Sequence, residues 1–155
     1  MKANCTVCIS TIQWDISPEP VTQEAPASYR KVNGVWNVCY HTPSDNPQLP
    51  DHTRTLLSFD GSFIDIRRSG AINGSIQYTS GKKTKTVMDL GFSNICIEND
   101  TFSICSGSSE SLAPFTLNDC EDTAILFISV EYGLYLNGEY ISRCTTTITL
   151  KPLRA

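Results

Sequence analysis

The chain has 155 residues, of which 18% are charged, and its formal net charge is −4. This length suits one domain with a hydrophobic core. The acidic balance argues against broad contact with a nucleic-acid backbone, which needs clustered lysines and arginines. No apolar stretch approaches the roughly 18 residues of a transmembrane helix, so we expect no membrane span. We therefore expect residues 1–155 to form a single domain that does not bind nucleic acid.

Residues 1–28 are expected to form an irregular N-terminal lead-in. Pro18, Pro20 and Pro26 would break any helix in this segment, and each biases the residue before it towards extended geometry. The first residues lack the apolar core of a signal peptide, so we expect that a secretion signal has been removed.

Residues 29–150 alternate between apolar and polar side chains, which is typical of β-strands. The segment 35–40 is the first clear strand, and the dipeptides Asp60-Gly61 and Asn137-Gly138 predict tight hairpins. We count eight to ten short strands at regular spacing, which is the pattern of a β-barrel or a β-sandwich. No segment has a clear period of 3.6 residues, so little helix is expected.

Seven scattered cysteines and three N-glycosylation sequons favour an oxidising compartment and a secreted, extracellular glycoprotein. An odd number of cysteines leaves one thiol unpaired, and we expect Cys39, or one of the Cys5/Cys8 pair, to be that thiol. The remaining disulfide candidates are Cys5, Cys8, Cys96, Cys105, Cys120 and Cys144. The sequons begin at Asn4, Asn73 and Asn99.

No group of residues has the pattern of a catalytic or metal site. His41 and His52 flank a proline-rich loop, but no nucleophile motif accompanies them. Cys5 and Cys8 have the spacing of half a zinc site or of a redox pair, yet structural disulfides fit a cysteine-rich secreted chain better. We expect no enzyme activity, no metal and no cofactor.

Apolar and aromatic side chains on the inward face of the strands have two interpretations. They fill the core of a sandwich, or they line a barrel that leaves room for one small ligand. For the second case the candidate ligand-binding residues are Tyr40, Phe59, Ile76, Tyr78, Met88 and Phe127. Periodicity alone leaves both interpretations open.

Three short motifs resemble those of the lipocalins. Gly34 and Trp36 match the Gly-x-Trp signature near the start of the first strand, and Tyr132 and Tyr135 match two positions of the second motif. Arg143 is similar to the arginine of the third motif, which in the family stacks on the tryptophan and closes the base of the barrel. The short interval before Arg143 and the lack of room for a final helix depart from the family. Seven cysteines suit its divergent members in arthropod secretions.

The resemblance implies an antiparallel up-and-down β-barrel of lipocalin type, here expected to be stapled by disulfides. It also implies a secreted carrier or scavenger of a small hydrophobic or amphipathic molecule, with Gly34, Trp36 and Arg143 at the barrel base. The alternative is a disulfide-rich β-sandwich that binds a protein partner, such as a receptor, cytokine or protease. It would do so through the loops at residues 42–50 and 107–111.

Overall fold

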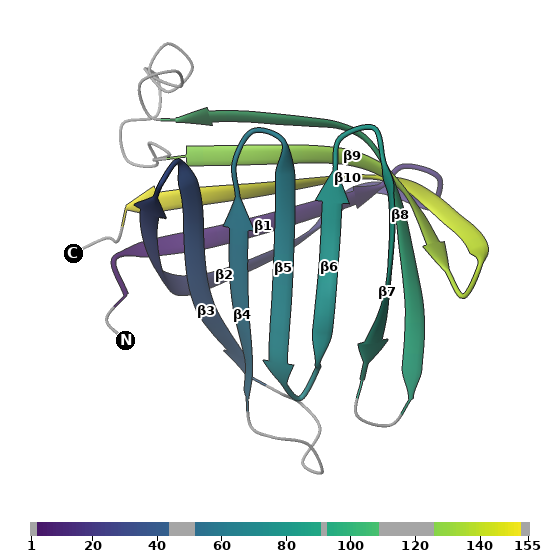
Figure 1. The fold of residues 1–155 in the computed structure, drawn as a ribbon, viewed down its shortest axis with the longest axis horizontal. Coiled ribbons are helices and arrows are strands. Elements are labelled where there is room, and N and C mark those ends of the chain that lie inside the picture. The colour runs from purple at the N-terminus through teal and green to yellow at the C-terminus, as the bar shows by residue number, and fades with distance from the viewer. Residues whose placement is uncertain (1–2, 44–51, 91–92, 109–125, 153–155) are drawn as a thin grey trace.

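The computed structural model describes residues 3–43, 52–90, 93–108 and 126–152, and their regular structure is entirely β. Ten strands follow one another along the chain (Figure 1). Their bounds are β1 Cys5–Gln13, β2 Ser17–Val32, β3 Val35–Pro43, β4 His52–Phe59, β5 Phe63–Gly70, β6 Gly74–Thr79, β7 Lys83–Asp89, β8 Asn94–Ser108, β9 Leu126–Leu136 and β10 Glu139–Pro152.

The strands form one antiparallel sheet in the order β6-β5-β4-β3-β2-β1-β10-β9-β8-β7. Strands that are consecutive in the sequence pair with each other, except β6 and β7, and β1 pairs with β10. The two edges, β6 and β7, approach each other: Asn73 and Asp89 form an isolated bridge, and the Thr84 hydroxyl donates a hydrogen bond to the Gln77 carbonyl. The sheet is therefore a nearly closed up-and-down barrel, which confirms the predicted barrel over the sandwich.

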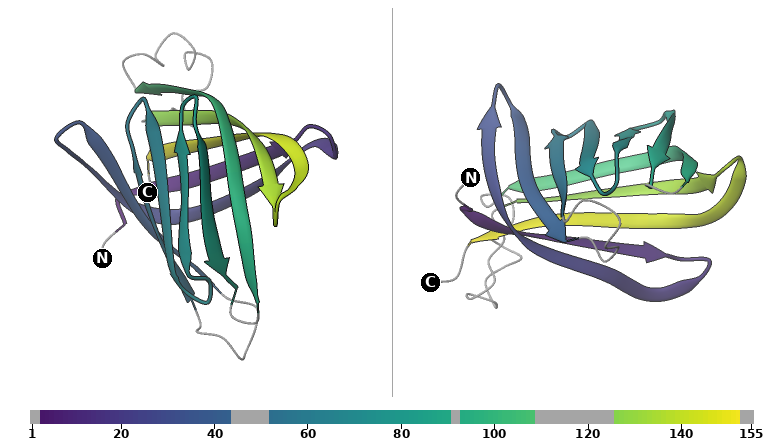
Figure 2. Two further views of the ribbon diagram at one scale, coloured as in Figure 1. Left: turned by 45° about the vertical axis from the view of Figure 1, so that its right-hand side comes forward. Right: turned by 90° about the horizontal axis from the view of Figure 1, so that it is seen from below.

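Two groups of strands cross each other in this barrel. In Figure 1, β3 to β6 run upright in front, while β1, β2, β9 and β10 run across behind them. Figure 2 shows from two further directions how the long strands β2, β8 and β10 curve between the groups. The inward faces of the two groups are in contact, since the rings of Tyr78 on β6 and Tyr132 on β9 lie with centroids 4.7 Å apart.

The hairpin turns follow local backbone chemistry. Asn137 and Gly138 have φ values of 50° and 85°, and Asn33 and Gly34 have nearly the same pair, 50° and 81°. Asparagine and glycine tolerate this left-handed geometry, which matches the twist of two-residue hairpins. At the β4–β5 turn, Asp60 Oδ1 accepts a hydrogen bond from the Ser62 amide at 2.7 Å. Both hairpins predicted from the sequence are present.

The prediction of an irregular segment at residues 1–28 is wrong, because this part of the chain forms β1 and most of β2. Pro18, Pro20 and Pro26 all lie on β2 without ending it. Strand β3 pairs only with residues 27–32 of β2, so no proline has a neighbour on that side. On the other side Pro26 lies opposite Thr6 of β1, whereas Pro18 and Pro20 fall in an irregularity of the β1–β2 register. A proline costs a sheet no hydrogen bond where its missing N–H would face outward.

The middle of the barrel is filled by side chains. Val38, Leu57 and Ile128 are 0% exposed, and further aliphatic residues from seven strands surround them. Residues at alternate positions of each strand point inward, which produces the alternating burial of β4, β9 and β10. Packing of this apolar surface is the main source of stability.

The predicted disulfides are absent from the described residues. Cys5, Cys8, Cys96, Cys105 and Cys144 are free thiols, as is Cys39. Cys120 lies outside the described residues. The described barrel therefore lacks the expected disulfides. Since all six described cysteines are free, the odd number of cysteines no longer distinguishes Cys39 as the unpaired thiol.

The sheet register explains why the two buried cysteines cannot pair. Cys5 lies opposite Pro152, whereas Cys144 lies opposite Gln13, eight residues further along β1. That separation is about 26 Å at 3.3 Å per residue, and a disulfide needs Cα atoms roughly 4.4–6.8 Å apart.

We expect the thiols to differ strongly in reactivity. Burial raises the pKa of the Cys5 thiol to about 11 and also raises that of Cys144, whereas Cys105 is exposed. Because the thiolate is the nucleophile, iodoacetamide at pH 8 should modify Cys105 first and Cys5 and Cys144 only on unfolding. Peptide mass spectrometry over a time course measures this order, and early modification of Cys5 would contradict the packing described here.

Candidate functional site

The two ends of the barrel are hollow, on either side of the filled middle. We name the hollows after one residue of each: the Trp36 pocket and the Arg68 pocket. Strands β3 and β4 connect them, since Trp36 and Phe59 line the first while Tyr40 and Thr55 line the second. Between these positions lie Val38 and Leu57, which are fully buried and separate the two pockets.

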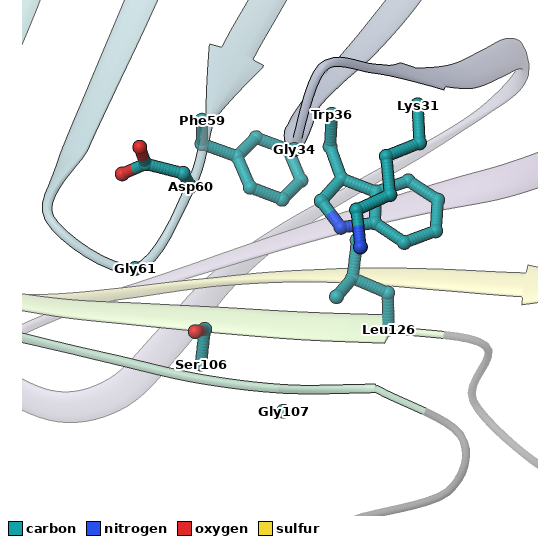
Figure 3. Close-up of a pocket in the computed structure, with 9 residues that line it drawn as sticks. All are labelled: Lys31, Gly34, Trp36, Phe59, Asp60, Gly61, Ser106, Gly107 and Leu126. Carbon is teal, nitrogen blue, oxygen red and sulfur yellow. The ribbon is translucent and has the colours of Figure 1, made fainter.

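The Trp36 pocket has a volume of about 300 Å³ and is open to solvent. Figure 3 shows the Phe59 ring pointing toward Trp36, Leu126 approaching from the opposite wall and the Lys31 side chain extending across the indole. The Tyr29 ring also packs against Trp36, with ring centroids 5.7 Å apart. The remaining lining residues are Gly34, Asp60, Gly61, Ser106 and Gly107.

Two aromatic rings and one cation stand out among the groups that line this pocket. Lys31 Nζ lies 5.3 Å from the centroid of the Trp36 ring, which is a cation–π distance. The Asp60 carboxylate is occupied by its own turn, where it accepts hydrogen bonds from Ser62 and Phe63, and those bonds lower its pKa. The pocket therefore offers an aromatic face beside an exposed ammonium group.

The Arg68 pocket is smaller, with a volume of about 240 Å³, and hydroxyl-bearing residues make up more of its described lining. Its lining combines side chains from β2, β3, β4 and β5 with one from the turn after β5. These residues are Gln23, Tyr40, Thr42, Thr53, Thr55, Arg68 and Ile72. Tyr40 and Thr55 are each 1% exposed, so polar groups reach this pocket from deep within the wall.

Arg68 influences two buried tyrosines beneath this pocket. Burial raises the pKa of Tyr40, while the charge of Arg68 and hydrogen bonding to Thr55 and Arg68 lower it. Burial also holds the pKa of Tyr78 well above its usual value, and Tyr132, whose ring centroid lies 4.7 Å away, raises it further. Both hydroxyls are therefore protonated at neutral pH, and that of Tyr40 accepts a hydrogen bond from Arg68.

The candidate ligand-binding residues occupy three kinds of position. Tyr40 lines the Arg68 pocket and Phe59 lines the Trp36 pocket. Ile76, Tyr78 and Met88 point inward but are buried in the filled core. The structure therefore divides these residues between opposite ends and the core, and their contact with a ligand stays a prediction.

The prediction that Phe127 faces the barrel interior is wrong. Leu126 and Ile128 on either side of it are 3% and 0% exposed, whereas Phe127 is only partly buried. Because successive side chains of a strand point to opposite faces, Phe127 lies on the outer face of β9.

The proposed contact between Trp36 and Arg143 is also absent. Arg143 pairs with Gly133 in the sheet, seven residues along β9 from Leu126 of the Trp36 pocket, or about 23 Å at 3.3 Å per residue. The Arg143 guanidinium instead forms an ion pair with Glu131 at 2.9 Å and a cation–π contact with the Phe102 ring. The cation on Trp36 is Lys31, and Gly34 supplies the turn beside it.

One of the predicted glycosylation sites is inaccessible in the folded chain. Asn99 is 1% exposed, so a glycan there is incompatible with the fold. Asn4 and Asn73 are exposed, although each also hydrogen-bonds to backbone groups through its side chain. Glycosylation at these two positions stays a prediction.

Sequence reasoning missed the two cations that characterise the pockets. Arg68 follows Ile64 and Ile66 at steps of two, and this alternation places it on the inward face of β5. The signal was present, but an arginine is not expected inside a barrel. Lys31 lies opposite Trp36 in the β2–β3 pairing, which only the register reveals.

Two other classes of feature are absent from the described part of the chain. It contains no helix long and apolar enough to cross a membrane. Among the residues described, no cluster of three or more histidine, cysteine or acidic side chains has an arrangement suited to a metal ion.

Comparison with solved structures shows where the same fold occurs. The crystal structure of the ywiB protein from Bacillus subtilis superposes with a TM-score of 0.73 at 17% identity, covering 98% of this chain and 93% of the other. No curated protein matches the sequence. The likeness to lipocalins holds for the type of barrel, with ten strands here against roughly eight there. The arthropod-secretion group receives no support.

Residues 7–148 match the model of a family described as a domain of unknown function, DUF1934. This match spans most of the barrel, from β1 to β10. The chain therefore belongs to the DUF1934 family.

Proposed function

We propose that this protein binds a small amphipathic molecule in the Trp36 pocket, as a carrier or scavenger. The observation that supports this function best is the combination of Trp36, Phe59 and Leu126 with the ammonium of Lys31 in one open pocket. Aromatic faces remove the apolar part of a ligand from water, and a single cation orients its polar end.

The dimensions of the pocket favour a ligand of modest size. A volume of about 300 Å³ is at the lower limit of small-molecule sites. A flat apolar body fits the offset or edge-on packing that aromatic rings prefer. The filled middle of the barrel prevents such a ligand from passing through to the Arg68 pocket.

An extracellular location is part of the same proposal, with less support than the sequence suggested. The free cysteines and the burial of Asn99 remove two of its arguments. Exposed Asn4 and Asn73 remain, and the intact mass of protein from its natural source would reveal glycans on them. The loops considered for a protein partner lie largely outside the described residues, so no observation favours that alternative.

We expect ligand binding to depend on Trp36 and Lys31 in different ways. The test uses two fluorescent probes with the same apolar skeleton: anilinonaphthalene sulfonate, which carries an anion, and N-phenylnaphthylamine, which does not. Trp36→Ala should weaken both by about tenfold, since stacking on an indole is worth roughly 1 kcal/mol or more. Lys31→Ala should weaken only the sulfonate, by about three- to fivefold.

Two controls keep the result specific to this pocket. Lys83→Ala removes an exposed lysine on β7 and should leave both affinities unchanged. In a Trp14→Phe background, Trp36 is the sole tryptophan, so energy transfer to the probe reports binding beside it. Equal binding by Trp36→Ala and the unmodified protein would refute the proposed function.

A further inference from the structure

Arg68 is a cation on the inward face of the barrel. It continues the series Ile64 and Ile66, both buried in the core, and is itself half-buried. Two ion pairs link the described residues, Arg67 with Asp65 and Arg143 with Glu131. Neither involves Arg68. A guanidinium withdrawn from water without an opposing charge is costly to the folded state.

The described surroundings of Arg68 supply hydroxyl and amide groups and, among the residues that the structure describes, no acid. The described lining supplies the hydroxyl groups of Tyr40 and three threonines and the amide of Gln23, and none of these described lining residues carries a carboxylate. Ile72 is the aliphatic residue of the described lining. Arginine has five N–H donors and no acceptor, so the group that satisfies this pocket best is one with several acceptor oxygens.

The geometry points to a binding site for a small oxyanion, a carboxylate or phosphate group, held by Arg68 with Tyr40, Thr53 and Thr55. The planar guanidinium binds such a group through two parallel hydrogen bonds. The hydroxyls supply further donors, and Ile72 contacts the apolar part of an organic anion. A pocket of about 240 Å³ accommodates inorganic phosphate or a small carboxylic acid.

This site is separate from the Trp36 pocket and does not depend on the proposed function. Val38 and Leu57, both 0% exposed, lie between the two along β3 and β4. A variant of Lys31 should therefore leave oxyanion binding unchanged, and a variant of Arg68 should leave binding of the naphthalene probes unchanged. Failure of either site can thus be told apart from failure of the other.

The test compares Arg68→Gln with Arg67→Gln, its neighbour on β5. Arg67 faces outward, with a side chain that is 69% exposed, so the pair differs in the face of the sheet and not in the charge removed. Isothermal titration calorimetry at constant ionic strength uses three probes: inorganic phosphate, benzoate and benzamide. Benzamide has the shape of benzoate without its charge. Comparing phosphate with benzoate shows whether the site prefers a phosphate group or a carboxylate.

We expect the unmodified protein and Arg67→Gln to bind phosphate or benzoate, and neither to bind benzamide. Arg68→Gln should weaken that binding at least about tenfold, and Arg68→Lys, which retains the charge without the planar fork, should fall between. The bound anion should also raise the midpoint of thermal unfolding in proportion to its saturation. If neither anion binds the unmodified protein, or if Arg68→Gln binds as tightly, the inference is wrong.

Discussion

Gly70→Ala is expected to destabilise the barrel by about 3 kcal/mol or more, a large part of the roughly 5–15 kcal/mol available to a domain. Gly70 has a φ of 124°, which side chains of L residues rarely adopt. A Cβ atom there would also lie 2.2 Å from the His52 carbonyl oxygen on the paired strand. Because the obstacle is backbone, no rotamer change can relieve it. Urea unfolding measures the loss.

Gly81→Ala is the matched control for this substitution. Gly81 also has a positive φ, of 75°, but nothing lies within 4 Å of the added Cβ. It should cost only the conformational penalty of about 1–2 kcal/mol. Equal losses at the two glycines would mean that β4 and β5 do not approach as described.

Ile128→Ala is expected to cost about 3 kcal/mol, within the roughly 2–5 kcal/mol range for emptying a buried aliphatic site. Ile128 is 0% exposed and lies opposite Ile148 of β10, which is 2% exposed. The filled middle of the barrel leaves few ways for neighbours to close the resulting cavity. The change in free energy of unfolding, measured in urea, is the readout.

Phe127→Ala tests the same strand on its outer face. Although phenylalanine loses more atoms than isoleucine, Phe127 is only partly buried, so we expect a loss of about 1 kcal/mol or less. A loss at Phe127 that exceeded the loss at Ile128 would show that β9 presents the opposite face to the core.

The sequence predicted some residues of the candidate site, but it did not predict which of them share a pocket. The alternation of apolar and polar residues correctly placed Tyr40 and Phe59 on the inward face. It could not show that they lie at opposite ends of the barrel. The same rule would have placed Arg68 inward, had its charge not suggested solvent. Phe127 shows the limit of the rule, because a shift of one residue reverses the face of every side chain.

Local chemistry determined the class of fold and its turns. Alternating apolar residues gave strands because a strand exposes its two faces in turn. Asn137 with Gly138 gave a hairpin because these residues tolerate positive φ. These features depend on neighbours in the chain, so the sequence by itself was sufficient for them.

Only the tertiary structure decided how distant segments pair. Pro18, Pro20 and Pro26 looked like breaks, yet β2 continues through them because it lacks a second neighbour there. The register of β1 on β10 keeps Cys5 far from Cys144. The fit of β2 against β3 places Lys31, and not Arg143, on Trp36. Such contacts join residues far apart in the chain, so no local pattern encodes them.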